Sequence, residues 1–127
     1  MDSYVVEPQS LFVPYLADVL AQAEMRVVRV APHLDVQDVL RIAPQALFVD
    51  TDFLEIDPAD ALRAMREALP SAFICAYAEI DAPAAERFRR AGANCVLSKK
   101  LGPAEIADRL RTARRAPARV ETVRGEI

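Results

Sequence analysis

The stretch Ala46-Leu47-Phe48-Val49-Asp50 is an apolar run that ends abruptly at a carboxylate. Its apolar residues are consecutive rather than alternating, which is typical of a strand buried on both faces of a parallel sheet. A polar stretch follows at once, so Asp50 is expected at the carboxyl tip of this strand. Open α/β sheets bind ligands in the crevice outside such tips. The run therefore predicts a fold class and the position of a site.

Four further short apolar runs alternate with helical patterns along the chain. The runs are Ser3–Val6, Arg26–Val30, Ala72–Ala76 and Cys95–Ser98. The helical patterns begin near the candidate caps Ser10, Asp35, Asp57 and Asp81 and at Gly102-Pro103. One of them carries Leu11, Tyr15, Leu16, Val19 and Leu20 at helical spacing, and the last runs to about Arg115.

This alternation predicts an α/β domain with a doubly wound, five-stranded parallel sheet and helices on both faces. The common strand order for five such units is 2-1-3-4-5, which makes the tips of the first, third and fifth strands near neighbours. Glu7, Asp50 and Lys99 follow or end these strands. We therefore expect an acid pair and a lysine to meet at one edge of the sheet.

Length and composition fit one domain. The chain has 127 residues, of which 53% are apolar, and its net charge is -3. An acidic balance argues against binding of nucleic acid, and no apolar segment approaches the roughly 20 residues that span a bilayer. We expect a cytoplasmic domain over residues 1–115, with 116–127 as a tail or the start of a linker.

Two alternatives based on local chemistry receive little support. Cys75 and Cys95 form neither a CxxC motif nor a disulfide framework, and they are expected to be buried free thiols. No glycine-rich loop follows the first strand, so the usual phosphate cradle of a nucleotide binder is missing. No paired nucleophile and base is evident, and we expect a protein that is not an enzyme.

The ordered units resemble the receiver domain of bacterial two-component response regulators over roughly residues 3–115. The resemblance is carried by the runs Val5–Pro8, Leu47–Asp50, Ile74–Ala78, Ala91–Asn94, Val96–Lys99 and Gly102-Pro103. It implies the flavodoxin-like receiver fold, with Asp50 as phospho-acceptor and Lys99 as the cation beside the phosphoryl group. It also implies partners: a histidine kinase or phosphotransfer protein, and a downstream protein target.

The resemblance implies a Mg²⁺ site that this sequence has altered. The family has two acidic residues after its first strand, and here they are Glu7 and Pro8. Proline has no ligand atom, so Mg²⁺ binding is weakened, with Glu7, Asp50 and Asp52 as the remaining candidate ligands.

Other family positions are also changed. Cys75 is assigned to the usual Thr or Ser position, and a thiol is a weaker donor than a hydroxyl. The aromatic switch position holds Val96. Lys100 replaces the proline that follows the family's lysine, so a trans peptide is expected there.

These changes leave two functions open. One is a receiver in a phosphorelay, with Asp50 phosphorylated in an atypical site. The other is a pseudo-receiver that binds proteins without phosphorylation. In both, the family's docking face comprises the fourth helix, the fifth strand and the fifth helix. Its charges could form reciprocal ion pairs in a homodimer, and they are Glu86, Arg89, Arg90, Glu105, Asp108, Arg109 and Arg111.

Overall fold

The computed structural model describes residues 1–115, and the predicted tail 116–127 lies outside them. The strands are β1 (Asp2–Val6), β2 (Arg26–Ala31), β3 (Ala46–Asp50), β4 (Phe73–Ala78) and β5 (Cys95–Ser98). The α-helices are α1 (Val13–Gln22), α2 (Val36–Ile42), α3 (Pro58–Ala68), α4 (Ala82–Ala91) and α5 (Pro103–Arg115). Two short 3₁₀ turns, η1 (Ser10–Phe12) and η2 (Thr51–Phe53), follow β1 and β3.

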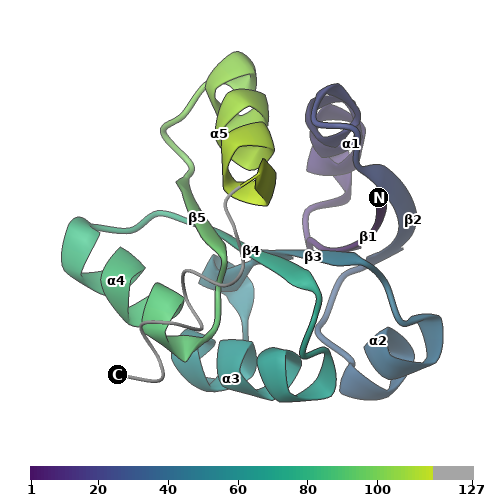
Figure 1. Cartoon of the computed structure of the whole chain (residues 1–127), viewed down its shortest axis with the longest axis vertical. Helices are drawn as coiled ribbons and strands as arrows, with labels where there is room; N and C mark the ends of the chain where they lie inside the picture. The colour runs from purple at the N-terminus through teal and green to yellow at the C-terminus, as the bar shows by residue number, and fades with distance from the viewer. Residues whose placement is uncertain (116–127) are drawn as a thin grey trace.

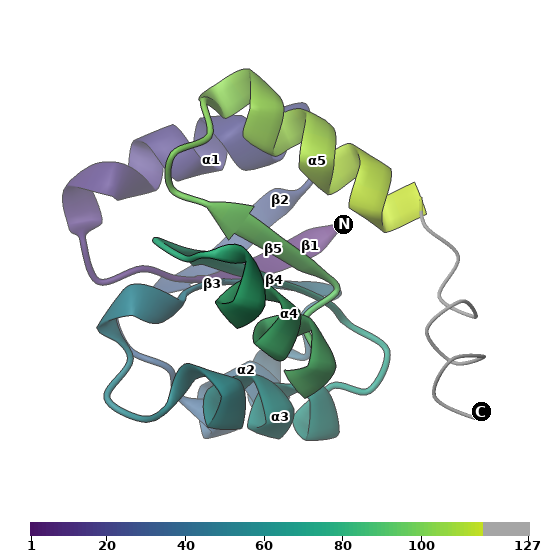
Figure 2. The same cartoon turned by 90° about the vertical axis from the view of Figure 1, so that its left-hand side faces the viewer.

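The five strands form one parallel sheet in the order β2-β1-β3-β4-β5, as predicted. Helices α1 and α5 cover one face, and α2, α3 and α4 cover the other (Figures 1 and 2). Every residue of β3 and β4 is buried, which explains why their sequences show no alternation. Successive side chains enter different layers: Phe48 packs toward α1 and α5, whereas Leu47 and Val49 pack toward α2 and α3.

Local signals set most helix starts. The side chains of Asp35, Asp57 and Asp81 each accept a hydrogen bond from a backbone N–H of the first helical turn. Ser10 differs from its predicted role, because it begins η1 and its side chain caps nothing. As a result Leu11, predicted on the apolar helix face, is 95% exposed.

Helix α2 is attached to the sheet by a buried polar contact. The Tyr4 hydroxyl of β1 donates to Oδ2 of Asp38 at 2.6 Å. Asp38 also pairs with Arg41 of the same helix and with Arg29 of the edge strand β2. This contact fixes the half of the fold that lies beside β1.

Helix length also bears on membrane association. None of the helices between residues 1 and 115 has both the length and the apolar character needed to cross a bilayer.

Candidate functional site

The site lies at the carboxyl edge of the sheet, where β3 ends at Asp50. The Asp50 side chain has no solvent exposure. Lys99 follows the last residue of β5, and its backbone N–H donates to the carbonyl of Ala78 at the end of β4, at 3.0 Å. Its Nζ lies 2.9 Å from both Oδ1 and Oδ2 of Asp50. The strand order thus brings together residues 49 positions apart.

The same ammonium group binds a second carboxylate. Nζ of Lys99 lies 2.9 Å from Oδ2 of Asp52, in the η2 turn after β3. Burial of Lys99 disfavours its charge, but its hydrogen bonds to Asp52 and Asp50 outweigh burial and raise its pKa. Lys99 therefore stays charged and neutralises part of a carboxylate pair.

The Asp52 carboxylate also contacts the loop after β4. The backbone N–H of Glu79 donates to Oδ2 of Asp52 at 3.0 Å and lies 3.3 Å from Oδ1. The backbone N–H of Asp52 itself donates to Oδ1 of Asp50 at 3.0 Å. The loops after β3 and β4 are thereby linked through one side chain.

Two aromatic rings cover Lys99. Its Nζ lies 4.9 Å from the ring centroid of Phe53 and 5.5 Å from that of Tyr77. Such distances allow cation–π attraction and reduce access of water to the ammonium group. Phe53 is 49% exposed, so its outer face remains open to a partner.

Glu7 lies beside Asp50 from the end of β1. Glu7 is 2% exposed. Its Oε2 accepts a hydrogen bond from the backbone N–H of Gln9 at 3.1 Å. Its Oε1 has no hydrogen-bond partner within the described residues. Burial, opposed by the Gln9 N–H, is the largest cause that raises the pKa of Glu7 to about 7, and the neighbouring Asp50 carboxylate adds to it. Protonation of Glu7 relieves the repulsion between the two groups.

These residues do not complete the donor set of a Mg²⁺ site. Magnesium takes octahedral oxygen ligands. Within residues 1–115 no group of three or more acidic, His or Cys side chains is arranged to hold a metal ion. Asp52, a predicted ligand, has its carboxylate engaged by Lys99 and Glu79, and Pro8 supplies no ligand. Glu7 and Asp50 remain adjacent with one unpartnered oxygen, Oε1 of Glu7.

The structure separates Cys75 from the other predicted site residues. Cys75 pairs with Phe48 in the sheet, two residues before the tip of β3, and its thiol donates weakly to the carbonyl of Ala76 at 3.7 Å. Tyr77 is the residue level with Asp50. A signal for this was present, because the apolar run continues to Ala78 before the first charge at Glu79.

Two hollows flank Phe53 at this edge. One, of about 290 Å³, is lined by Pro8, Asp50 and apolar residues that follow β2 and β3, among them Leu34, Ile56 and Val36 at the start of α2. The other, of about 580 Å³, is lined by Gln9, Phe12, Asp52, Tyr77, Glu79 and Lys99. The buried charges therefore lie beneath a surface with an apolar rim.

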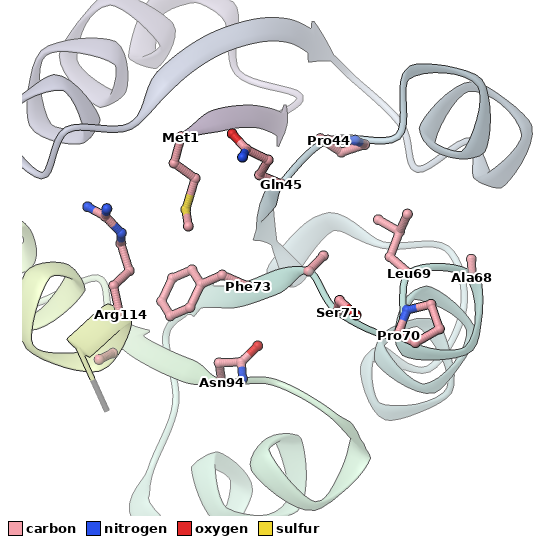
Figure 3. Close-up of a pocket in the computed structure, with 12 residues that line it drawn as sticks. Met1, Pro44, Gln45, Ala68, Leu69, Pro70, Ser71, Phe73, Asn94 and Arg114 are labelled. Atoms are coloured by element: carbon pink, nitrogen blue, oxygen red, sulfur yellow. The ribbon is translucent and has the colours of Figure 1, made fainter. Parts of the chain in front are cut away.

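A third hollow, of about 660 Å³, lies at the opposite end of the sheet (Figure 3). Its lining includes Met1, Gln45, Phe73, Asn94 and Arg114. Among residues 1–115, no carboxylate or thiol lines this hollow, so its described lining offers less chemistry than the Asp50 edge despite its size.

Comparison with solved structures identifies the fold. A response-regulator candidate from Chloroflexus aurantiacus is 25% identical, with a TM-score of 0.74 over 88% of this chain and 95% of that chain. A response regulator from Thermotoga maritima is 16% identical, with a TM-score of 0.73 over 88% and 95%. A candidate pilus assembly protein, cpaE, from Burkholderia thailandensis is 19% identical, with a TM-score of 0.72 over 90% and 98%.

Comparison of the sequence with protein-family models and with curated proteins gives no match. The three-dimensional likeness is nevertheless extensive, since each of these solved chains is covered almost completely. The chain has the fold of response-regulator receiver domains, as the sequence resemblance predicted.

Proposed function

We propose that this chain is a receiver module of bacterial two-component signalling in which Asp50 accepts a phosphoryl group. The observation that supports this is the pairing of Asp50, at the tip of the central strand of a receiver fold, with Lys99 at 2.9 Å to both carboxylate oxygens. A carboxylate and a fixed ammonium are the acceptor and the charge-neutralising group that phosphoryl transfer requires.

In the transfer step one Asp50 oxygen attacks the phosphorus of a phosphohistidine or of an acyl phosphate. The bond from phosphorus to the donor nitrogen or oxygen breaks, and the donor leaves with that electron pair. Lys99 then neutralises charge on the phosphoryl oxygens. The chain consumes one phosphoryl group per molecule, as a signalling acceptor does, rather than turning over a substrate.

The partners of such a module are a histidine kinase or phosphotransfer protein and a downstream protein target, in the cytoplasm. The surface around Asp50 suits docking of a protein, because exposed apolar side chains surround the buried charges. Among them are Leu11, Phe12, Phe53 and Ile56, which are 43% to 95% exposed.

The first prediction concerns the acceptor. Incubation with acetyl phosphate over a wide range of Mg²⁺ concentrations should add the mass of one phosphoryl group, as read by intact-protein mass spectrometry. Asp50→Asn should abolish the adduct, since an amide is not an acceptor. Asp52→Asn is the matched control, because it removes a neighbouring acid that also contacts Lys99 and should leave the adduct in place.

A second candidate function is that of a pseudo-receiver, which binds proteins without phosphorylation. It is favoured by the full burial of the Asp50 carboxylate under Lys99 and by Pro8 in the acidic-pair position. The receiver fold also occurs in the candidate pilus assembly protein cpaE from Burkholderia thailandensis.

The adduct measurement, combined with an Asp50→Asn allele, distinguishes the two functions. An absent adduct at every Mg²⁺ concentration, together with full activity of an Asp50→Asn allele replacing the native gene, would support the pseudo-receiver. Loss of activity in that allele, with a normally folded Asp50→Asn protein, would support the acceptor.

A further inference from the structure

Two cysteines that are 20 residues apart in sequence face each other in the sheet. Cys75 of β4 is the direct register partner of Cys95 of β5, and both belong to the core layer under α1 and α5. Both are free thiols. Cα atoms of directly opposed residues on adjacent strands lie about 4.8 Å apart, which is within the range of about 4.4–6.8 Å that a disulfide bridges.

The two thiols differ in access. Cys75 has no exposed surface, whereas Cys95 is 8% exposed and lines a surface hollow of about 380 Å³ between α4 and α5. Other residues around that hollow include Arg89, Asp108, Arg109 and Thr112. A small reagent in the hollow can therefore reach Cys95 but not Cys75.

The surroundings also favour Cys95 as the reacting thiol. The neighbouring Cys75 thiol, opposed by burial, lowers the pKa of Cys95, and the guanidinium groups of Arg89 and Arg109 contribute in the same direction. Burial raises the pKa of Cys75. Asp108 lines the same hollow, but the pKa of Cys95 is still lowered overall. The thiolate is the nucleophilic form of cysteine.

We propose that Cys95 is an oxidation site for hydroperoxides on the face formed by α4, β5 and α5, and that Cys75 is its resolving thiol. The Cys95 sulfur attacks one peroxide oxygen and the O–O bond breaks. The products are a sulfenic acid on Cys95 and an alcohol, or water when the oxidant is hydrogen peroxide. The thiol proton passes to the departing oxygen.

The second step closes the pair. The Cys75 sulfur attacks the Cys95 sulfur, the S–O bond breaks, and water leaves with the Cys75 proton. The two thiols are oxidised by two electrons in total and one peroxide is reduced. The disulfide joins the edge strand β5 to β4 under α5, on a face that the receiver resemblance assigns to partner docking.

The test uses the full reduced chain exposed to hydrogen peroxide under native conditions. Remaining thiols are blocked with maleimide, and peptide mapping locates the products. The expected product is an intramolecular Cys75–Cys95 disulfide. Cys75→Ser should instead accumulate a sulfenic acid on Cys95 that dimedone traps, and Cys95→Ser should leave Cys75 as a thiol.

Adding Arg89→Gln and Arg109→Gln to the Cys75→Ser variant keeps Cys95 and should slow its dimedone labelling after peroxide treatment several-fold. Far-ultraviolet circular dichroism confirms that each variant is folded. Peptide mapping of the wild-type protein tests the proposal without any variant. Peroxide treatment that leaves both wild-type thiols intact, or that joins only different molecules, would overturn the proposal. Equal oxidation of Cys75 in the Cys95→Ser variant would also overturn it.

Discussion

At the scale of single residues, the site is an excess of carboxylates around one ammonium group. Asp50, Asp52 and Glu7 lie within reach of each other or of Lys99, which is the cation bound to both aspartates. The pKa of Glu7, about 7, lets this acid take up a proton close to neutral pH, which lowers the negative charge beside Asp50.

The raised pKa of Glu7 makes stability depend on pH. The pKa of Glu7 is about 7 in the folded chain, against its ordinary 4.5, so the folded state holds the proton more tightly than the unfolded state. The contribution to the free energy of unfolding is complete below pH 4.5, falls as pH rises to about 7, and is lost above. The loss amounts to about 3 kcal/mol.

Glu7→Gln should remove this slope, because an amide is neutral at every pH. Urea unfolding at pH 5 and pH 8, with a chelator present, measures the slope, and the variant should gain relative to wild type only at pH 8. Glu79→Gln, at an exposed side chain, is the control. Parallel pH curves for wild type and Glu7→Gln would contradict the raised pKa of Glu7.

We infer that Pro8 weakens the metal site, because it stands where the receiver resemblance has a second acidic residue. Pro8→Asp should restore a second carboxylate next to Glu7 and strengthen Mg²⁺ binding, as isothermal titration calorimetry would show. Pro32→Asp is the matched control, because Pro32 lines the same hollow as Pro8, from the loop after β2. A comparable gain in both variants would mean that added charge alone, rather than ligand position, is responsible.

At the scale of elements, caps and turns decide where each helix ends. Helix α4 ends at Gly92, whose φ of +127° is strained for any residue with a side chain. A Cβ added there would also lie 2.8 Å from Cβ of Arg66. Arg66 donates to the Gly92 carbonyl, which joins α3 to the end of α4.

Gly92→Ala should lower the free energy of unfolding by about 1–3 kcal/mol. Gly102→Ala is the matched control, because a Cβ there meets only Oε1 of Glu105, at 3.7 Å. Chemical denaturation of both variants measures the difference. Equal stability of the two variants would show that the turn after α4 can change its conformation at little cost.

The elements also show how much of the fold could be predicted from the sequence. The run Ala46–Asp50 matches β3 exactly as predicted, because a charge ends it, and Asp-Pro marks the start of α3. The end of β4 was predicted two residues early, since Ala76, Tyr77 and Ala78 are all apolar and nothing polar marks the tip. That difference placed Cys75, rather than Tyr77, at the site.

Contacts made by long side chains could not be predicted in the same way. The strand order brought Lys99 to Asp50, but the bond from Lys99 to Asp52 depends on rotamers and on the η2 turn. The register of Cys75 with Cys95 follows from strand ends to within a residue or two, which is too coarse to pair two thiols.

At the scale of the whole molecule, several charges on the face formed by α4, β5 and α5 are paired within their own helix. Glu86 pairs with Arg89 and Arg90, and Asp108 pairs with Arg111, at 3.4–3.7 Å. Exposed pairs contribute about 0–1 kcal/mol each. A dimer through this face must exchange these bonds for equivalent ones between molecules.

We therefore expect any dimer through this face to be weak and to dissociate as salt is added. Size-exclusion chromatography with light scattering at two salt concentrations measures it. Arg90→Glu should reduce the average mass at low salt, because it reverses one charge of the face. A strictly monomeric protein at low salt would count against the dimer.

The hydrogen bonds of Lys99 affect how the neighbouring loops respond when Asp50 is modified. An ammonium group has three N–H donors, and Lys99 already has three acceptor oxygens, two on Asp50 and one on Asp52. Its donor valence is saturated. A new acceptor in the site can bind Lys99 only by displacing one of these carboxylate oxygens. Asp52 is the more exposed of the two aspartates. Asp52 also holds the Glu79 N–H. The amide resonance of Glu79 should therefore report occupancy of Asp50 from across the crevice.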